Sequence, residues 1–307
     1  MARASVFRSA WGIGILTMVA LAAAAAAPRA PVPAAPKAEA AAPDARARPG
    51  AIDDMRILRV LETQAQRLLD GGKTTPMTDL ISQLSRTSCD VRLAKPSAAP
   101  LAPEELYERC KKGVLVLGSL FKCEKCGRNH VSPATGFVLS ESGAAVTNYH
   151  VVSSPKNLTL VAMTADGSVC PVKSVLAASA ACDVAILQLD ATGLVPLALG
   201  PRAPVGSDVF VISHPDRRFY TLGKGIVARY GMMVRNKQRV TMLQITADYA
   251  RGSSGGPILS GAGDVVGMAS STVSVYYDED HGKQENFQMA FDQCVPAEQI
   301  LELVKGK

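Results

Sequence analysis

The chain has 307 residues, 48% of them apolar, which is enough for one sizeable domain with additional segments. Lysine and arginine outnumber aspartate and glutamate by 33 to 27, and no basic block stands out along the chain. Two of these cations lie among the first eight residues. So small a surplus of positive charge does not support a polyanion-binding protein. We therefore expect no nucleic-acid partner.

Residues 1–27 form a targeting segment. Arg3 and Arg8 precede an apolar run over 10–27, in which Thr17 is the only clearly polar side chain. This order is typical of a signal peptide. The run also fits an uncleaved membrane anchor, since eighteen residues at helical rise span about 27 Å. Both alternatives place the rest of the chain in the periplasm or outside the cell.

Residues 28–50 are rich in proline and alanine and predict a linker. Over 51–112 the pattern becomes helical, with apolar residues at three- and four-residue steps between Ile52 and Leu69. A short second helix is predicted to begin at Thr75, and a third to run from Pro103 to about Lys112. Such helices pack on a neighbouring domain or act as a prosegment, an oligomerisation arm or a regulator.

From Val114 on, short runs of β-formers alternate with Gly, Pro, Asp and Ser, and the predicted domain covers 113–307. About a dozen short strands with little helix between them indicate an all-β barrel or sandwich, with a brief helix after Pro296. The strands are expected at 114–121, 135–140, 144–147, 157–163, 169–176, 184–189, 208–213, 224–230, 239–246, 257–260, 264–272 and 287–291.

Three segments of this region carry residues suited to nucleophilic catalysis. His150 follows a predicted strand, Asp183 precedes one, and Ser254 lies in a Gly-Ser-Ser-Gly-Gly-Pro loop. A serine hydroxyl attacks at neutral pH only if a base takes its proton, and a buried carboxylate orients that base. The order His, Asp, Ser with separations of 33 and 71 residues predicts a catalytic triad, although each residue alone is a weak signal.

The glycine-rich loop also predicts an oxyanion site. Glycines let the backbone turn tightly enough to point N–H groups at a developing negative charge. We expect these donors among Gly252, Ser253 and Ser254. Both serines carry a hydroxyl, and the Gly-Gly-Pro that follows assigns the nucleophile to Ser254.

The stretch from about 113 to 301, roughly three-fifths of the chain, resembles the HtrA/DegP-like branch of the trypsin-like (chymotrypsin-fold) serine proteases. This resemblance implies two six-stranded antiparallel β-barrels with the site in their crevice, serine endopeptidase activity and protein or peptide substrates. About ten residues follow the last strand signal, so no PDZ domain is expected. The matching segments are 135–139, 146–152, 183–187, 214–215, 225–227, 244–248, 252–257, 289–291 and 295–296.

Two positions qualify the resemblance. Ser253 stands where the family usually has Asn or Asp. Asp248 lies six residues before Ser254, an offset at which an acid in trypsin-like relatives binds a basic substrate side chain. A plain loop acid remains the alternative for Asp248.

Seven cysteines in an exported chain predict up to three disulfides, among them Cys170–Cys182. Cys123 and Cys126 have three readings. The first is a disulfide that fastens the loop between two strands. The second is a Zn²⁺ site that the two cysteines form together with Cys110 and His130, and the third is a redox dithiol.

The sequence thus predicts a serine endopeptidase without a cofactor, for envelope protein processing or quality control, and leaves an oligomer open. The alternatives are a catalytically silent protease-fold binding protein and a cysteine-based zinc or redox module.

Overall fold

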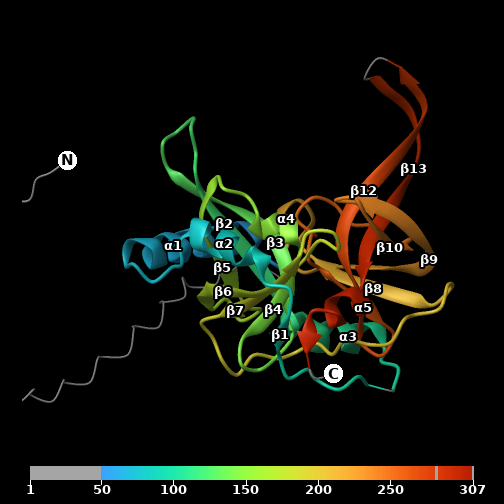
Figure 1. Cartoon of the computed structure of the whole chain (residues 1–307), viewed down its shortest axis with the longest axis horizontal. Coiled ribbons are helices and arrows are strands. Elements are labelled where there is room, and N and C mark those ends of the chain that lie inside the picture. Colours follow the sequence, from blue (N-terminus) through green and yellow to red (C-terminus); the bar gives the residue numbers. More distant parts are fainter. Residues whose placement is uncertain (1–49, 98, 281–282, 306–307) are drawn as a thin grey trace, which may run out of the picture. The chain divides into compact units, whose positions relative to one another are not determined.

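The computed structural model describes residues 50–305 except 98 and 281–282 (Figure 1). The predicted leader over 1–27 and nearly all of the linker over 28–50 lie outside the described residues. The segment Gly50–Lys307 forms one compact unit. None of the described helices is long and apolar enough to cross a membrane.

The first barrel closes in the order β2-β3-β4-β7-β6-β5, and all its neighbouring strands pair antiparallel. Its β-branched and leucine-rich strands bury seven of the nine β2 residues and all of β4. The strands are β2 (Val114–Lys122), β3 (Asn129–Val138), β4 (Ala144–Thr147), β5 (Asn157–Met163), β6 (Val169–Ser179) and β7 (Val184–Leu189).

The second barrel closes in the order β10-β13-β12-β11-β8-β9, again antiparallel. The predicted all-β fold of two six-stranded antiparallel barrels is therefore confirmed. The strands are β8 (Asp208–Ser213), β9 (Thr221–Arg235), β10 (Gln238–Ile245), β11 (Pro257–Ser260), β12 (Val265–Asp280) and β13 (Lys283–Pro296).

Strands β12 and β13 are longer than predicted and form an arm that projects from the second barrel (Figure 1). Their pairing runs from Gly267↔Pro296 to Asp280↔Lys283. The strands predicted at 264–272 and 287–291 therefore continue through most of the segment between them. The arm lies away from the core, so its outer half lacks the alternation of buried apolar residues by which a strand is recognised.

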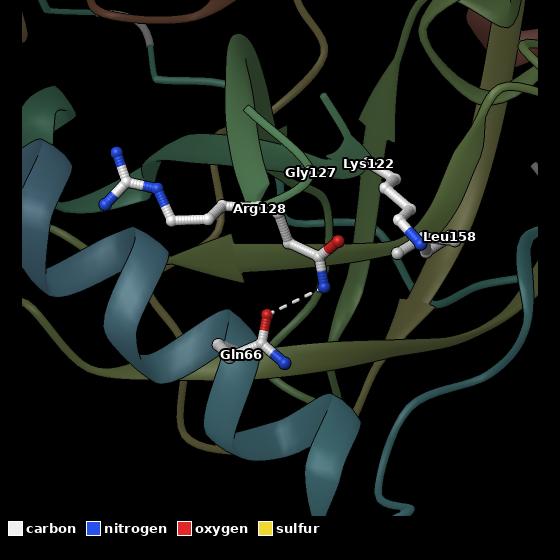
Figure 2. Close-up of a pocket in the computed structure, with 6 residues that line it drawn as sticks. Gln66, Lys122, Gly127, Arg128 and Leu158 are labelled. Atoms are coloured by element: carbon white, nitrogen blue, oxygen red, sulfur yellow. Dashed lines mark hydrogen bonds between the residues drawn. The ribbon is translucent and has the colours of Figure 1, made fainter. Parts of the chain in front are cut away.

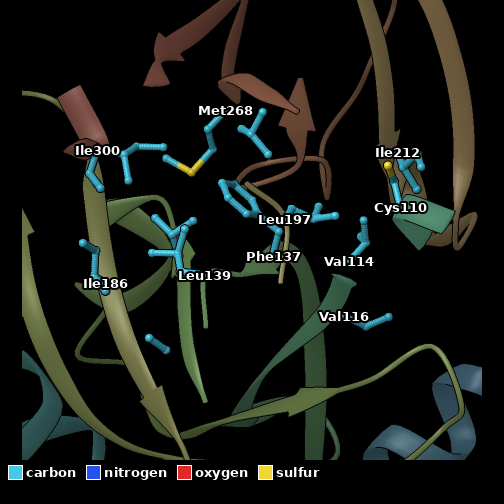
Figure 3. Packing of buried hydrophobic residues seen from close by; sticks show 14 of the residues in the cluster. Cys110, Val114, Val116, Phe137, Leu139, Ile186, Leu197, Ile212, Met268 and Ile300 are labelled. Carbon is cyan, nitrogen blue, oxygen red and sulfur yellow. The ribbon is translucent and has the colours of Figure 1, made fainter. Parts of the chain in front are cut away.

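A continuous apolar core joins the two barrels (Figure 3). Phe137 and Leu139 come from the first barrel, Ile212 and Met268 from the second, and all four are fully buried. Ile300 of α5 (Ala297–Leu301) extends the same cluster. The core fixes the two barrels against each other, and with them the elements that carry the candidate site.

The predicted N-terminal helices pack on the barrels. Asp53 caps α1 (Asp54–Asp70) by accepting a hydrogen bond from the backbone N–H of Arg56, and Leu61 and Ala65 of α1 are fully buried. Next come α2 (Met77–Ser82), which Pro76 precedes as N-cap, η1 (Gln83–Ser85), α3 (Pro103–Cys110) and η2 (Lys111–Gly113). The remaining short elements are α4 (Tyr149–Val152), η3 (Pro215–Arg217) and a parallel pair of β1 (Cys89–Asp90) and β14 (Val304–Lys305).

Candidate active site

Neighbouring strands bring His150 and Asp183 together. Strand β4 pairs antiparallel with β7 in the register Thr147↔Ala185, so the end of β4 lies beside the start of β7. His150 follows β4 in the short helix α4, and Asp183 immediately precedes β7. His150 Nδ1 is 3.0 Å from each carboxylate oxygen of Asp183, and the backbone N–H of His150 donates to Oδ1 at 3.1 Å.

This contact defines the imidazole tautomer. An ionised carboxylate only accepts hydrogen bonds, so Nδ1 of His150 carries the proton that it donates to Asp183. The neutral ring then has its lone pair on Nε2, the atom that takes a proton in base catalysis. The His150 side chain is half exposed, so Nε2 is open to a reactant.

Asp183 is held in an unusual backbone conformation. Its φ is 60°, in the left-handed region, and its carbonyl accepts a hydrogen bond from Asn148 Nδ2 at 3.0 Å. Burial raises the pKa of the Asp183 carboxyl, but hydrogen bonds from His150 and Ser270 outweigh burial and hold that pKa below its ordinary value. Asp183 is therefore a buried carboxylate that stays ionised.

The loop between β10 and β11 carries Ser254 and is fastened to the first barrel by Thr135 of β3. Thr135 Oγ1 donates to the carbonyl of Gly252 at 2.8 Å, and the Thr135 N–H donates to the carbonyl of Ser254 at 2.9 Å. Gly252 and Gly255 have φ of 101° and 87°, which favour glycine. Sequence reasoning missed Thr135, because nothing local shows that β3 reaches this loop.

The predicted oxyanion donors separate into two groups. The Ser253 N–H donates to the carbonyl of Ala250 at 2.9 Å, and its buried hydroxyl accepts from Ser213 Oγ at 2.9 Å. The prediction of Ser253 as a donor was wrong, because the turn already uses its N–H. Within the described residues, the N–H groups of Gly252 and Ser254 donate to no acceptor, so both remain free for an incoming oxyanion.

A β-bulge places Ser270 between Ser254 and Asp183. In the β12–β13 ladder Ala269 pairs with Cys294 and Ser271 pairs with Gln293, so Ser270 is the extra residue. Ser270 Oγ donates to Asp183 Oδ2 at 2.7 Å, and its carbonyl accepts from Ser254 Oγ at 3.5 Å. Among the hydrogen bonds of the described residues, none joins Ser254 to His150.

Arg235 adds a cation to the site. It ends β9, before a turn in which Asn236 and Lys237 have φ of 49° and 63°. Its Nη1 lies 3.5 Å from Asp183 Oδ2, and only 22% of its side chain is exposed. No sequence signal marks Arg235, because β9 and Asp183 belong to different barrels.

Two acidic residues lie near the β10–β11 loop that carries Ser254. Asp248 is exposed, whereas Asp292 of β13 is 3% exposed and pairs with Thr272, two residues beyond Ser270. Burial, and then the charge of Asp248, raises the pKa of Asp292 to about 6. Asp292 Oδ1 has no hydrogen-bond partner among the described residues. Sequence reasoning identified Asp248 and missed Asp292.

His214 is a structural residue, fully buried beside the nucleophile loop. Its Nδ1 accepts the N–H of Tyr220 at 3.0 Å, so its Nε2 carries the proton and donates to the carbonyl of Leu115 at 3.1 Å. Burial lowers the pKa of His214 to about 4, which keeps the ring neutral. His214 therefore connects the barrels and is no second catalytic base.

The cysteines differ from the prediction in two respects. All seven are free thiols in the structure, so the expected Cys170–Cys182 disulfide is absent. Cys110 is buried 3.6 Å from the carbonyl of Gly263 and does not join the proposed zinc ligands, because α3 carries it against the second barrel.

The ligand atoms of Cys123, Cys126 and His130 do converge, all within 4.8 Å of one another. The backbone N–H of Arg128, and then the His130 imidazole, lower the pKa of Cys126 to about 6. The same contact with Cys126 raises the pKa of His130. This cluster belongs to the first barrel and takes part in none of the contacts of His150, Asp183 and Ser254 described above.

Residues 134–268 match the trypsin-like peptidase domain family. This segment includes the two catalytic candidates brought together by β4 and β7 and the loop of Ser254. This part of the chain is similar to a trypsin-like peptidase domain. Nearly half of the chain is also similar to curated proteins named probable periplasmic serine endoprotease DegP-like. The one from Pseudomonas fluorescens is 33% identical over 145 residues, and the one from Brucella suis is 32% identical over 148 residues.

These matches cover 47% of this chain but only 30% and 28% of the two relatives. Solved structures resemble the trypsin-like domain in fold. The HtrA-type protease AlgW with a decapeptide has a TM-score of 0.53 and 18% identity, covering 66% of both chains. Rv3671c from M. tuberculosis has a TM-score of 0.50 and 20% identity, covering 69% of this chain and 94% of its own.

Proposed function

We propose that the chain is a serine endopeptidase that cleaves peptide bonds through an acyl-enzyme. Ser254 attacks the carbonyl carbon, and Nε2 of His150 takes the proton from its hydroxyl. Asp183 keeps the imidazole oriented and stabilises the imidazolium. His150 then gives the proton to the leaving amine, and water releases the acyl group by the reverse sequence.

The free N–H groups of Gly252 and Ser254 are suited to bind the oxyanion of each tetrahedral intermediate. One such donor contributes about 3–4 kcal/mol to transition-state stabilisation in related chemistry. Thr135 holds the carbonyls of both residues, so the donors are positioned before the substrate arrives. Ser254 reaches His150 by rotating its side chain away from the Ser270 carbonyl, since catalytic hydrogen bonds often form fully only with substrate bound.

The observation that carries this proposal is the pair of 3.0 Å contacts between His150 Nδ1 and the buried Asp183 carboxylate, together with Ser270, which bridges Asp183 and Ser254. The contact between His150 and Asp183 is the one that serine activation requires, and the link through Ser270 supports Ser254 as the residue that His150 would serve. The DegP-like names of the relatives support the same chemistry.

Active-site labelling tests the proposal. A fluorophosphonate probe should modify the protein at Ser254, and Ser254→Ala and His150→Ala should abolish the labelling. Ser142→Ala is a matched control, because this exposed serine lies in the β3–β4 turn and, among the described residues, its hydroxyl hydrogen-bonds to Ser140 alone. Labelling at another residue, or equal labelling of the His150 variant, would reject the triad.

A catalytically silent binding protein is the second candidate. The Ser254 hydroxyl donates to Ser270 rather than to His150, which is the geometry of an unengaged nucleophile. This candidate predicts that correctly folded protein resists the probe yet binds peptides. The two proposals therefore give opposite results in one labelling experiment.

We further propose that the protease acts outside the cytoplasm on envelope proteins, with the helices of 51–112 as an accessory region. The relatives are named as periplasmic proteases, and the sequence pattern of residues 1–27 agrees with export. For specificity we propose that Asp248, together with Asp292, selects a basic substrate side chain. A peptide-library cleavage profile tests this, and an unchanged profile in Asp248→Asn and Asp292→Asn would oppose it.

A further inference from the structure

The tip of the β2–β3 hairpin gathers two thiols and an imidazole. Cys126 Sγ lies 3.2 Å from His130 Nε2, and the ligand atoms of Cys123, Cys126 and His130 are within 4.8 Å of one another. In a tetrahedral zinc site the bonds of about 2.3 Å to sulfur and about 2.0–2.1 Å to nitrogen place such atoms roughly 3.5 Å apart. Cys126 and His130 are already at this spacing, and small side-chain movements would bring all three atoms onto one ion.

Main-chain hydrogen bonds hold the turn that carries both cysteines. The Cys123 N–H donates to the carbonyl of Arg128, and the Gly127 N–H donates to the carbonyl of Cys123, each at 2.8 Å. Gly127 has φ of 70°, which a side chain would oppose. The turn is therefore fixed by main-chain bonds that do not involve the thiols.

The imidazole is oriented from its other side by helix α1. His130 Nδ1 lies 3.5 Å from Glu62 Oε1, and the same oxygen accepts the Val131 N–H at 3.3 Å. A carboxylate on one ring nitrogen fixes the tautomer and leaves the other nitrogen free to bind a metal. Here the free nitrogen is Nε2, which faces Cys126.

Helix and hairpin meet again one turn further along. Asn129 Nδ2 donates to Gln66 Oε1 at 2.9 Å, and the two side chains border a pocket of about 640 Å³ (Figure 2). Gly127 and Arg128 of the cysteine turn line the same pocket. The cysteine cluster thus sits where α1 is attached to the first barrel.

We propose that Cys123, Cys126 and His130 bind one zinc ion, with water in the fourth position and Glu62 as the group that orients His130. Binding removes the protons of the two thiols and requires no redox step. Two thiolates and one imidazole are ligands that suit Zn²⁺. A structural disulfide would use only the two sulfurs and would give no role to the imidazole held between Cys126 and Glu62, whereas a redox dithiol would form a Cys123–Cys126 disulfide even when Zn²⁺ is present.

Metal binding by the full chain tests the proposal directly. Protein reduced and freed of metal with a chelator is titrated with Zn²⁺ against a chromophoric competitor, and bound zinc is measured by mass spectrometry. We expect one zinc per chain in the wild type and its loss in Cys126→Ser and His130→Ala. Cys170→Ser, a half-buried cysteine of the same barrel, should bind zinc like the wild type. Glu62→Gln should weaken affinity about 10- to 100-fold.

A second measurement avoids variants that fail to fold. In the wild type, Zn²⁺ should slow alkylation of Cys123 and Cys126, mapped by peptide mass spectrometry, and leave the other five cysteines unchanged. Binding of Co²⁺ should produce a thiolate-to-cobalt absorption band. No zinc retention, zinc binding that persists in Cys126→Ser, or a Cys123–Cys126 disulfide that forms in the presence of Zn²⁺ would overturn the site. All these results are independent of the Ser254 labelling.

Discussion

Removing the Ser270 hydroxyl, a change of one oxygen atom, tests whether Ser270 positions Asp183 for catalysis. Ser270 Oγ donates to Asp183 Oδ2 at 2.7 Å, inside a buried contact. A hydrogen bond to a charged group is worth about 1.5–3 kcal/mol. If Ser270→Ala loses that much stabilisation of the ion pair in the transition state, the rate constant should fall about 10- to 150-fold, at 1.36 kcal/mol per tenfold.

The assay is the second-order rate of fluorophosphonate labelling, which needs no knowledge of the natural substrate. Ser271→Ala is the matched control, because the neighbouring hydroxyl contacts Gln293 Oε1 at 3.4 Å and not Asp183. Equal rates in the two variants would refute the assignment of Ser270 as the residue that positions Asp183.

The same variant has a defined pH signature. The folded-state pKa of Asp183 lies below its ordinary value, so the carboxylate stabilises the fold above its unfolded-state pKa, and this contribution is lost as pH falls through the folded value. Without the Ser270 hydroxyl the folded pKa should rise. Acid unfolding of Ser270→Ala should therefore begin at a higher pH than that of the wild type.

Three further predictions concern neighbouring groups. Thr135→Val removes the hydrogen bond to the Gly252 carbonyl. It should lower the free energy of unfolding by about 0.5–1.5 kcal/mol, measured by thermal unfolding, and should slow Ser254 labelling; an unchanged labelling rate would show that Thr135 does not position the oxyanion donors. Arg235→Gln removes the cation 3.5 Å from ionised Asp183, so acid unfolding of this variant should begin at a higher pH than that of the wild type; exposed Lys237→Gln should leave the onset in place, and a shift in both variants would contradict this. Asp292 has a pKa raised from 3.8 to about 6, so its ionisation destabilises the fold as pH rises through that range. In denaturant unfolding, Asp292→Asn should gain on the order of 3 kcal/mol at pH 8 and far less at pH 4, and equal gains at both pH values would refute this.

The sequence predicted an all-β barrel or sandwich because strand spacing and turn residues are local signals, and the resemblance to trypsin-like proteases implied the two six-stranded barrels. It also predicted which His, Asp and Ser to combine, and β4–β7 pairing brings the first two together. Ser270 was missed because its role arises from a bulge, which depends on the register of β12 against β13. Arg235 was missed because it acts across the two barrels.

The cysteines show a different failure. Compartment and spacing suggested disulfides and a zinc site that included Cys110. Neither the compartment nor the cysteine spacing indicates the direction in which a side chain points. Helix α3 turns Cys110 toward Gly263, and the hairpin turn directs Cys123 and Cys126 toward His130. Only the packing of α3 and the shape of the turn decide which thiols meet.

The left-handed backbone at position 183 limits what evolution can place there. At φ of 60° most side chains are strained, whereas Asp and Asn are tolerated. An Asp-to-Asn exchange would preserve the turn and the barrel while removing the charge that orients His150. A single isosteric exchange thus separates an active protease from a catalytically silent binding protein of the same fold. A family with this fold can lose catalysis without losing its structure.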